Sequence, residues 1–474
     1  MIEEKKHSLM PFTRRHFFES SGGFLGAAIG YLWASEGLIA APLGDLTSGP
    51  EAGRIAPRLP VKINSVIFLY MCGGVSHIDT FDPKDNKYAG KMIEAVGFGD
   101  NQAKMQRPVI PILRTYTQYG KSGIAVSDWF PNVGSCVDEI AMIRSMYTQE
   151  VNHFPAAIEM VTGHRGRQFN HPCLGSWIYY ALGSANKNLP VFINMGRPTT
   201  PVQLTGGYLG TIYSATPFGT GEVPVENLNT PKSVSLPQRE KDLALLHSFN
   251  EEFRHEYETD MEIAARLKSY ELAARMQLSV PELTDFSREP ESIKGLYGIG
   301  EKETDSFGRQ LLLARRLSEK GVRFIQVCHG GGGNGAWDSH GDIKAHAPLC
   351  RETDKPIAGL IKDLKQRGML NNTLVVWATE FGRTPWSQNT TGRDHNPRGF
   401  TCWMAGGGVK GGIVVGSTDE VGFNAVEDRV YVSDLNATIL HLMGLNYEDL
   451  NTVINNRPVR LVEPGFGPVK KILA

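Results

Sequence analysis

The sequence predicts an α/β fold with a mostly parallel central sheet, helices on both faces and a helical insertion. Short apolar runs rich in β-branched and aromatic residues recur along the chain, and helical periodicity is found between them. Several of these runs end in glycine-rich or polar loops. Strands that alternate with helices pair in parallel through right-handed crossovers. We therefore expect functional residues to gather at the carboxyl ends of the strands.

The amino-terminal segment, residues 1–41, is expected to be a twin-arginine export signal. Arg14 and Arg15 precede an uncharged run, residues 22–33, that is rich in glycine and alanine and short for a membrane span. A surface arginine pair before a short buried helix is the alternative. Cleavage near Ala40 and Ala41 would release the protein to the periplasm or the medium, whereas an uncleaved signal would anchor it to the membrane.

Residues 42–60 are dense in glycine, proline and small polar residues, which indicates a linker. The remaining chain, residues 61–474, is long enough for one large domain with insertions or for two domains. A net charge of −1 argues against a nucleic-acid partner. The six cysteines form no Cys-x-x-Cys pair and no regular spacing, so we expect buried thiols rather than a zinc ribbon or a disulfide scaffold.

The predicted elements follow in chain order. The first strand is expected within residues 61–71, which end in a β-rich run before Cys72-Gly73-Gly74. Residues 199–236 are rich in threonine, glycine and proline and are predicted to form surface loops. Residues 238–320 are polar and helix-favouring, which indicates a helical insertion or cap. The later strands are predicted at 322–328, 374–378 and 401–405, and the later helices at 306–320 and 433–442.

Four polar clusters follow predicted strands and carry the candidate chemistry. They are His77 with Asp79, Asp338 with His340, Glu380 with Arg383, and Asp394 with His395. Imidazole nitrogens and carboxylate oxygens together suit divalent metals. We expect one or two ions (Zn, Mn or Ca) to be bound by six residues: His77, Asp79, Asp338, His340, Glu380 and His395. In the alternative interpretation, each pair only caps a turn or the start of a helix.

The segment from His153 to Gly163 resembles the nucleophile loop and helix of sulfatases. Its spacing reproduces Cys-x-Pro-Ser-Arg-x-x-x-x-Thr-Gly, with His153 at the position of the nucleophile. Residues 371–382 are similar to the sulfatase-type Asp-Asn-Thr-Leu-Val-x-Phe-Thr-Ser-Asp-His/Asn-Gly, and residues 432–440 to Val-Asp-Leu-x-Pro-Thr-Leu. These blocks occur in the order found in the alkaline phosphatase and sulfatase superfamily.

Four further motifs resemble a bacterial family known as domain of unknown function 1501. They are Gly-Gly-x-Ser-His-x-Asp-Thr-Phe-Asp-Pro-Lys, Trp-Asp-x-His, Thr-Glu-Phe-Gly-Arg-Thr-Pro and Gly-Arg-Asp-His-Asn-Pro. The resemblance covers nearly the whole chain after the linker. It implies an alkaline phosphatase-like or sulfatase-like fold.

The superfamily resemblance implies metal-binding roles for Asp338, His340, Glu380 and His395. At least three positions depart from the superfamily pattern. Phe381 stands where active relatives have His or Asn, Cys72-Gly73 replaces the Asp that ends the first strand, and His153 replaces the nucleophile. An imidazole does not simply replace the nucleophilic hydroxyl or thiol, so these departures argue against the usual covalent mechanism.

Two classes of function follow. In the first, an exported metal-dependent hydrolase acts on an anionic small-molecule or glycan ester of phosphate or sulfate. His153 would be a ligand or general base, Arg383 would steady the anion and Asp394 would be a catalytic carboxylate. In the second, the fold has lost catalysis and serves as a binding or assembly protein of the cell envelope, with an envelope protein as its partner.

Overall fold

The computed structural model describes residues 55–96, 104–165, 170–220, 234–256, 261–387, 391–454 and 457–474. The expected signal, residues 1–41, and linker residues 42–54 lie outside this part of the chain. The chain divides into two compact units. One unit contains the described residues between 234 and 281, and the other contains all the rest.

A central sheet organises the larger unit. Within the described residues it has nine strands, and all of them run parallel except β13, which is antiparallel to both of its neighbours. The mostly parallel α/β fold predicted from the sequence is therefore confirmed. In spatial order the strands are β14 (Ile413–Val415), β6 (Ile140–Tyr147), β13 (Phe400–Gly406), β10 (Thr373–Ala378), β1 (Ser65–Met71), β9 (Phe324–His329), β7 (Phe192–Met195) and β8 (Thr216–Phe218), with β17 (Val430–Tyr431) beside β6.

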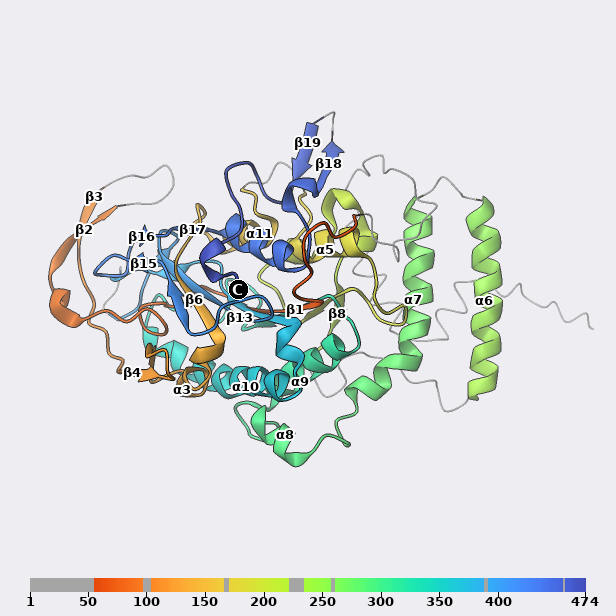
Figure 1. Cartoon of the computed structure of the whole chain (residues 1–474), viewed down its shortest axis with the longest axis horizontal. Coiled ribbons are helices and arrows are strands. Elements are labelled where there is room, and N and C mark those ends of the chain that lie inside the picture. Colours follow the sequence, from red (N-terminus) through yellow and green to blue (C-terminus); the bar gives the residue numbers. More distant parts are fainter. Residues whose placement is uncertain are drawn as a thin grey trace, which may run out of the picture. The chain divides into compact units, whose positions relative to one another are not determined.

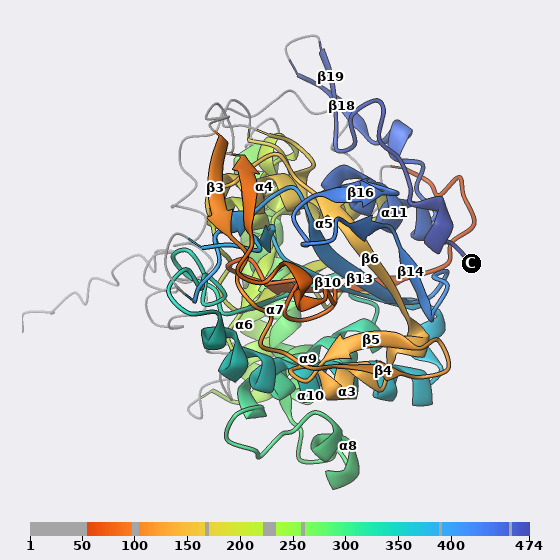
Figure 2. The ribbon, with the colours of Figure 1, turned by 90° about the vertical axis from the view of Figure 1, so that its left-hand side faces the viewer.

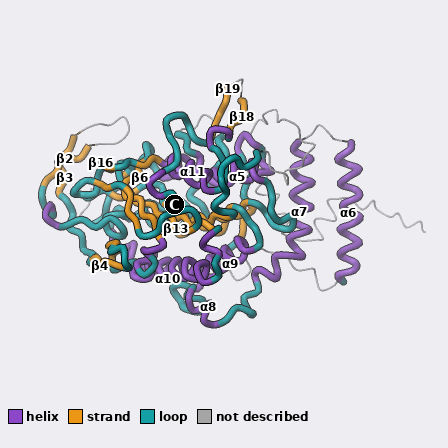
Figure 3. Tube along the Cα trace, in the orientation of Figure 1, coloured by secondary structure: helices purple, strands orange, loops and turns teal. Residues whose placement is uncertain are grey.

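Helices cover both faces of this sheet (Figures 1 and 2). Figure 3 shows the strands together between the two helical layers. One layer contains α3 (Pro131–Gly134), α9 (Asp305–Glu319) and α10 (His346–Gln366). The other contains α4 (His153–Thr162), α5 (Leu174–Leu182) and α11 (Val432–Leu442).

Burial explains why the central strands could be predicted. Every residue of β1, β9 and β10 is buried, as expected for parallel strands covered on both faces, so each reads as a continuous apolar run. The first strand begins at Ser65 rather than at residue 61, because the preceding residues Val61, Lys62 and Asn64 are exposed. The helix predicted at 306–320 is confirmed as α9, and the later predicted strands and helix are confirmed as β9, β10, β13 and α11.

Shorter hairpins decorate the larger unit. They are β2 (Met92–Val96) with β3 (Lys104–Pro108), β4 (Tyr116–Tyr119) with β5 (Ile124–Ser127), β11 (Gly382–Arg383) with β12 (His395–Asn396), β15 (Ser417–Thr418) with β16 (Ala425–Glu427), and β18 (Asn451–Ile454) with β19 (Arg457–Arg460). A short helix, α8 (Glu291–Leu296), precedes α9. Between 199 and 220 the chain forms short 3-10 turns and the edge strand β8.

The smaller unit consists of α6 (Leu236–Glu256) and most of α7 (Met261–Thr284). Arg239 on α6 donates to the side chain of Gln277 on α7 at 2.7 Å. Residues 238–320 are therefore largely helical, but α8 and α9 belong to the same compact unit as the sheet. Among the described residues, no helix is both long and apolar enough to cross a membrane.

Candidate metal centre

The topology brings four separate loops to one edge of the sheet. Asp338 follows β9, Glu380 follows β10, and His153 begins α4 after β6, so all three lie beyond the carboxyl ends of parallel strands. His395 instead precedes β13. Because β13 is antiparallel to β10 and β6, its amino end lies at the same edge, and His395 joins the group.

Three imidazoles meet at the Asp338 carboxylate. His153 Nε2 lies 3.3 Å from Asp338 Oδ2, whereas His340 Nε2 and His395 Nε2 lie 3.0 and 3.2 Å from Asp338 Oδ1. The potential ligand atoms of His153, Asp338 and His395 all lie within 4.8 Å of one another. The His340 side chain is 41% exposed and marks the solvent side, while His153 is only 5% exposed.

Each imidazole has its Nδ1 atom at an oxygen acceptor. His153 Nδ1 is 2.9 Å from Glu380 Oε1, and His395 Nδ1 is 2.6 Å from the Val151 carbonyl oxygen. His340 Nδ1 is 3.3 Å from Asp394 Oδ1. An acceptor of this kind assigns the proton to Nδ1 and leaves a lone pair on Nε2, as it does in histidines that bind metals.

The contact between His340 and His395 points to a cation. Their Nε2 atoms are 2.9 Å apart, and both face the same carboxylate oxygen. With both rings protonated at Nδ1, lone pairs of like charge would converge unless a metal ion or an additional proton lay among them. His153 Nε2 is also buried and without a hydrogen-bond partner. The residues present therefore suit a divalent metal of the zinc or manganese type.

Charges around the cluster shift its pKa values. Burial disfavours the charged form of Asp338, but the adjoining His153 and His395 rings and the Arg383 guanidinium outweigh it and hold the Asp338 pKa well below its usual range. Burial also opposes protonation of His153, yet Asp338 and Glu380 raise its pKa overall. The pKa of His395 is lowered, chiefly by burial.

Glu380 is placed behind His153 rather than among the converging ligand atoms. Its carboxylate is fully buried, and Oε1 accepts from the Gly73 backbone N–H at 2.8 Å as well as facing His153 Nδ1. The buried Tyr70 phenol lies nearby, and burial together with the Glu380 charge raises the Tyr70 pKa. In this arrangement Glu380 orients His153. Its predicted role as a direct metal ligand stays a prediction.

Arg383 is buried inside the loops and orients Asp338. Its side chain is 0% exposed, and Nη2 donates to Asp338 Oδ1 at 2.8 Å. Nη2 also reaches the backbone oxygens of Gly73 and Trp337, while Nε donates to that of Gly74 and Nη1 to that of Arg393. This placement favours a role in holding the ligand loop. The expected role of Arg383 in steadying an anionic substrate stays a prediction that this geometry does not favour.

His77 and Asp79 lie outside the cluster of converging ligand atoms. His77 Nε2 is 2.7 Å from the Gly422 carbonyl oxygen, and burial lowers the His77 pKa. Asp79 is nearly fully buried and accepts from Arg393 Nε at 2.7 Å and from the Ser76 hydroxyl at 2.5 Å. Both residues hold loops together in the structure. Neither belongs to the group of ligand atoms around Asp338, so their metal binding stays a prediction.

Two features of the site were not expected from the sequence. Phe381 packs against two of the imidazoles, with ring centroids 4.4 Å from His395 and 5.0 Å from His153. The Val151 carbonyl orients His395, a contact that no side-chain motif reveals. One signal of the first feature is present in the sequence: Phe381 stands where the superfamily pattern has His or Asn. An apolar side chain at that position must pack against other groups of the site.

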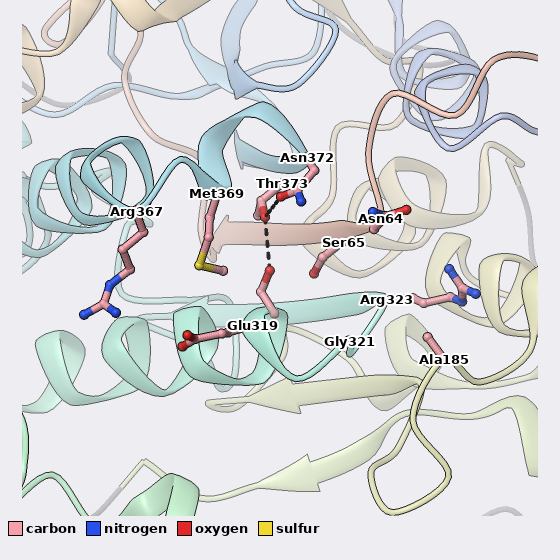
Figure 4. Close-up of a pocket in the computed structure, with 11 residues that line it drawn as sticks. Asn64, Ser65, Ala185, Glu319, Gly321, Arg323, Arg367, Met369, Asn372 and Thr373 are labelled. Atoms are coloured by element: carbon pink, nitrogen blue, oxygen red, sulfur yellow. Dashed lines mark hydrogen bonds between the residues drawn. The ribbon is translucent and has the colours of Figure 1, made fainter.

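The opposite, amino-terminal edge of the strands holds a polar cavity of about 640 Å³ (Figure 4). The hydroxyl of Thr373, labelled in Figure 4, is 3.2 Å from the Ser318 hydroxyl and donates to Asn372 Oδ1 at 3.4 Å. This cavity contains none of the predicted site residues. Its lining is Asn64, Ser65, Ala185, Ser318, Glu319, Gly321, Arg323, Arg367, Met369, Asn372 and Thr373.

All six cysteines are buried and free, as expected.

A family model described as a protein of unknown function (DUF1501) matches residues 63–473. The chain belongs to this family. The match spans the sheet, both helical layers and every loop of the cluster, and it bears out the family suggested by the sequence motifs. No curated protein matches this DUF1501 chain.

Solved structures similar to this DUF1501 protein include sulfatases and alkaline phosphatases. The PsFucS1 sulfatase from Pseudoalteromonas sp. has 13% identity and a TM-score of 0.35, covering 82% of this chain and 68% of that one. Alkaline phosphatase from the Antarctic bacterium TAB5 has 11% identity and a TM-score of 0.34, covering 82% and 100%. The lipoteichoic acid synthase LtaP from Listeria monocytogenes has 7% identity and a TM-score of 0.35, covering 87% and 79%.

Proposed function

We propose that this DUF1501 protein is a metal-dependent hydrolase of phosphate or sulfate esters with a non-standard site. The observation that carries the proposal is the convergence of three imidazole Nε2 atoms on one carboxylate, with every Nδ1 at an oxygen acceptor. A structural hydrogen-bond network has no need to direct the lone pairs of His153 and His395 at one carboxylate, whereas a metal site requires it.

His153, Asp338 and His395 would hold a divalent ion, with zinc and manganese favoured over calcium because two of the three ligands are imidazoles. Such an ion supplies Lewis acidity toward an ester oxygen and lowers the pKa of a water molecule. Arg383 holds Asp338 in place, Glu380 orients His153, and Phe381 packs against two of the rings.

His340 and Asp394 form the proton-handling pair in this proposal. His340 is the most exposed of the three imidazoles, and its Nδ1 is at Asp394 Oδ1, so its Nε2 can hold a proton at the solvent side. This gives Asp394 an orienting role in the chemistry. His153 is better placed as a ligand than as a general base, because its two ring nitrogens face the carboxylates of Asp338 and the buried Glu380.

The substrate proposed is an anionic small-molecule or glycan ester outside the cytoplasm. Export through the twin-arginine route is part of the proposal and is supported by the sequence pattern at Arg14 and Arg15. Metal loading before export would be consistent with the folded state in which twin-arginine substrates travel.

The test compares wild type with Asp338→Asn after zinc or manganese reconstitution, using a panel of phosphate and sulfate esters. Asp342→Asn is the matched control, because Asp342 lies four residues downstream and only caps a turn through the Lys344 N–H. We expect metal-dependent hydrolysis by wild type and the control and its loss in Asp338→Asn. Equal activity in all three proteins, or hydrolysis that needs no metal, would refute the proposal.

The second candidate is an inactive binding or assembly protein of the cell envelope. The observation in its favour is that His153 stands at the position of the nucleophile. The 2.9 Å contact between His340 Nε2 and His395 Nε2 also needs only a proton between the two rings, and no metal. This function predicts no metal uptake by wild type and retention of an envelope protein by an immobilised sample of it.

A further inference from the structure

The loop that carries Asp338 and His340 is hydrogen-bonded to a buried histidine that does not belong to the cluster of ligand atoms. His346 begins α10 and is fully buried. Its Nδ1 is 3.0 Å from the hydroxyl of Ser339, the residue between Asp338 and His340. Its Nε2 is 3.1 Å from the Ser76 backbone nitrogen, in the loop after β1. One ring therefore connects two loops at the edge of the sheet.

The hydrogen bonds define the state of this ring. The Ser76 backbone N–H can only donate, so His346 Nε2 must accept and carries no proton. The neutral ring then has its proton at Nδ1 and donates it to Ser339 Oγ. Trp337 packs edge-on against the imidazole with ring centroids 5.1 Å apart, which restricts its rotation. The ring is thereby held with its donor directed at the ligand loop.

Other contacts show how the ligand loop depends on this side chain. Ser339 is 4% exposed, and its backbone oxygen accepts from the Arg393 N–H at 3.2 Å. Arg383 donates to the Asp338 carboxylate at 2.8 Å. Without the Ser339 contact, Arg383 and the Gly335 carbonyl would still hold Asp338, and Asp394 would still face His340. The middle of the segment would keep only the backbone bond from Arg393.

We propose that His346 is a positioning residue that sets the ligand geometry of Asp338 and His340 through the Ser339 hydroxyl. The proposal rests on the proposed metal site, since its effect is read at those ligands. Orienting contacts behind the ligands typically change metal affinity by about 10–100-fold. We expect an effect in this range although His346 is not a ligand.

Two substitutions of His346 distinguish the role of its Nδ1 donor from that of its Nε2 acceptor. In His346→Asn, the amide keeps a donor near the former Nδ1 position and loses the acceptor for Ser76. In His346→Gln, the longer amide keeps an acceptor for Ser76 and loses the donor for Ser339. Ser339→Ala removes the same contact from the other side. Asp354→Asn is the control, because Asp354 is a buried carboxylate on α10 that binds α3 at Asn132 and Val133.

The experiment measures zinc affinity and the visible absorption of the cobalt-loaded protein for wild type and all four variants. We expect His346→Gln and Ser339→Ala to weaken zinc binding about tenfold or more and to change the cobalt spectrum. His346→Asn and Asp354→Asn should stay close to wild type. If wild type binds metal and all four variants bind equally well, the positioning role is refuted and the proposed function stands.

Hydrogen exchange of residues 337–342 in the metal-free proteins provides a second readout. We expect faster exchange of this segment in His346→Gln and Ser339→Ala but not in His346→Asn or Asp354→Asn. If wild type binds no metal, the proposed function fails, and this exchange pattern still decides the positioning role. Equal protection of the segment in all the proteins would overturn it.

Discussion

Two histidines of this site are each paired with a carboxylate. The carboxylate faces Nδ1 and orients the ring, so that Nε2 faces the cluster of ligand atoms. Glu380 faces Nδ1 of His153, and Asp394 faces Nδ1 of His340. Such carboxylate–histidine pairs fix the tautomer and raise the basicity of the nitrogen that remains. The chemistry expected of the site therefore depends as much on the buried acceptors as on the ligands themselves.

Replacement of Glu380 by Gln should weaken metal binding while leaving every proposed ligand in place. The neutral amide no longer stabilises the Nδ1–H of His153 with a full negative charge, so zinc affinity should fall by about 10–100-fold. Titration with a competing chelator measures this change. The control is Glu352→Gln, which alters a carboxylate–histidine pair at His329 that lies outside the cluster. An unchanged affinity in Glu380→Gln would show that Glu380 does not orient a ligand.

Protonation of His346 should make the fold less stable in acid. Burial, with a smaller contribution from Arg383, lowers the pKa of His346 to about 3 from the ordinary value of 6.5. Between these two pH values the unfolded chain binds a proton that the folded protein excludes, so stability falls as pH falls below about 6.5. The contribution of this one group is up to about 1.4 kcal/mol per pH unit.

Urea unfolding of wild type and His346→Asn from pH 7 to pH 4 measures this contribution. Other histidines contribute to both curves and cancel in the difference. We expect the wild-type curve to fall more steeply than that of the variant, so that the two proteins differ less at pH 4 than at pH 7. Parallel curves would show that His346 does not exclude a proton in the folded state.

At the scale of elements, close backbone approach at the strand ends builds the site. Gly73 follows β1 with a φ of 120°, and a Cβ atom there would lie 2.7 Å from the Asp338 nitrogen. The loops after β1 and β9 can therefore touch only if this residue is glycine. The same contact allows the Gly73 N–H to reach Glu380.

Gly73→Ala should destabilise the protein by about 1–3 kcal/mol and displace the Asp338 loop. The cost comes from the positive φ and from backbone atoms that cannot move aside. Gly341→Ala is the control, because the same loop offers open space at that position. Chemical denaturation gives the stability difference, and zinc titration reports the displacement. If both variants are equally stable, the close approach does not constrain the loops.

The predictability of the elements follows from their burial. Strands β1, β9 and β10 are buried throughout and read as apolar runs, so the sequence predicts them. Strand β6 contains Arg144 and Ser145, which interrupt its apolar pattern, and it was not predicted. The antiparallel direction of β13 was not predicted either, because no local pattern encodes it, yet it is this direction that places His395 in the site.

The candidate site residues could likewise be predicted only as far as local motifs allow. The motifs predicted that Asp338, His340, Glu380 and His395 share one edge, and the structure brings them together. Residue type could not distinguish these from His77 and Asp79, which have the same chemistry but partners of their own. Motif spacing also could not reveal that Arg383 is buried, since its partners are mostly backbone oxygens from distant loops.

At the scale of the whole molecule, the remaining expectation concerns its destination. The paired arginines lie outside the described residues, so only the sequence supports export through the twin-arginine route. Replacing Arg14 and Arg15 by lysine should abolish export, because the twin-arginine pair is an address read by a receptor and not a simple positive charge. Cell fractionation with immunodetection measures this, with Arg58→Lys as the control. Export that persists in the double variant would contradict the assignment.

The proposed chemistry depends on a metal ion held by His153, Asp338 and His395. Anomalous diffraction from crystals of the zinc-reconstituted protein, recorded on both sides of the zinc absorption edge, tests it most directly. We expect an anomalous peak within bonding distance of His153 Nε2, His395 Nε2 and an Asp338 oxygen, and no such peak in Asp338→Asn. A zinc-soaked crystal with no peak there, and with the imidazoles still in direct contact with the carboxylate, would contradict it.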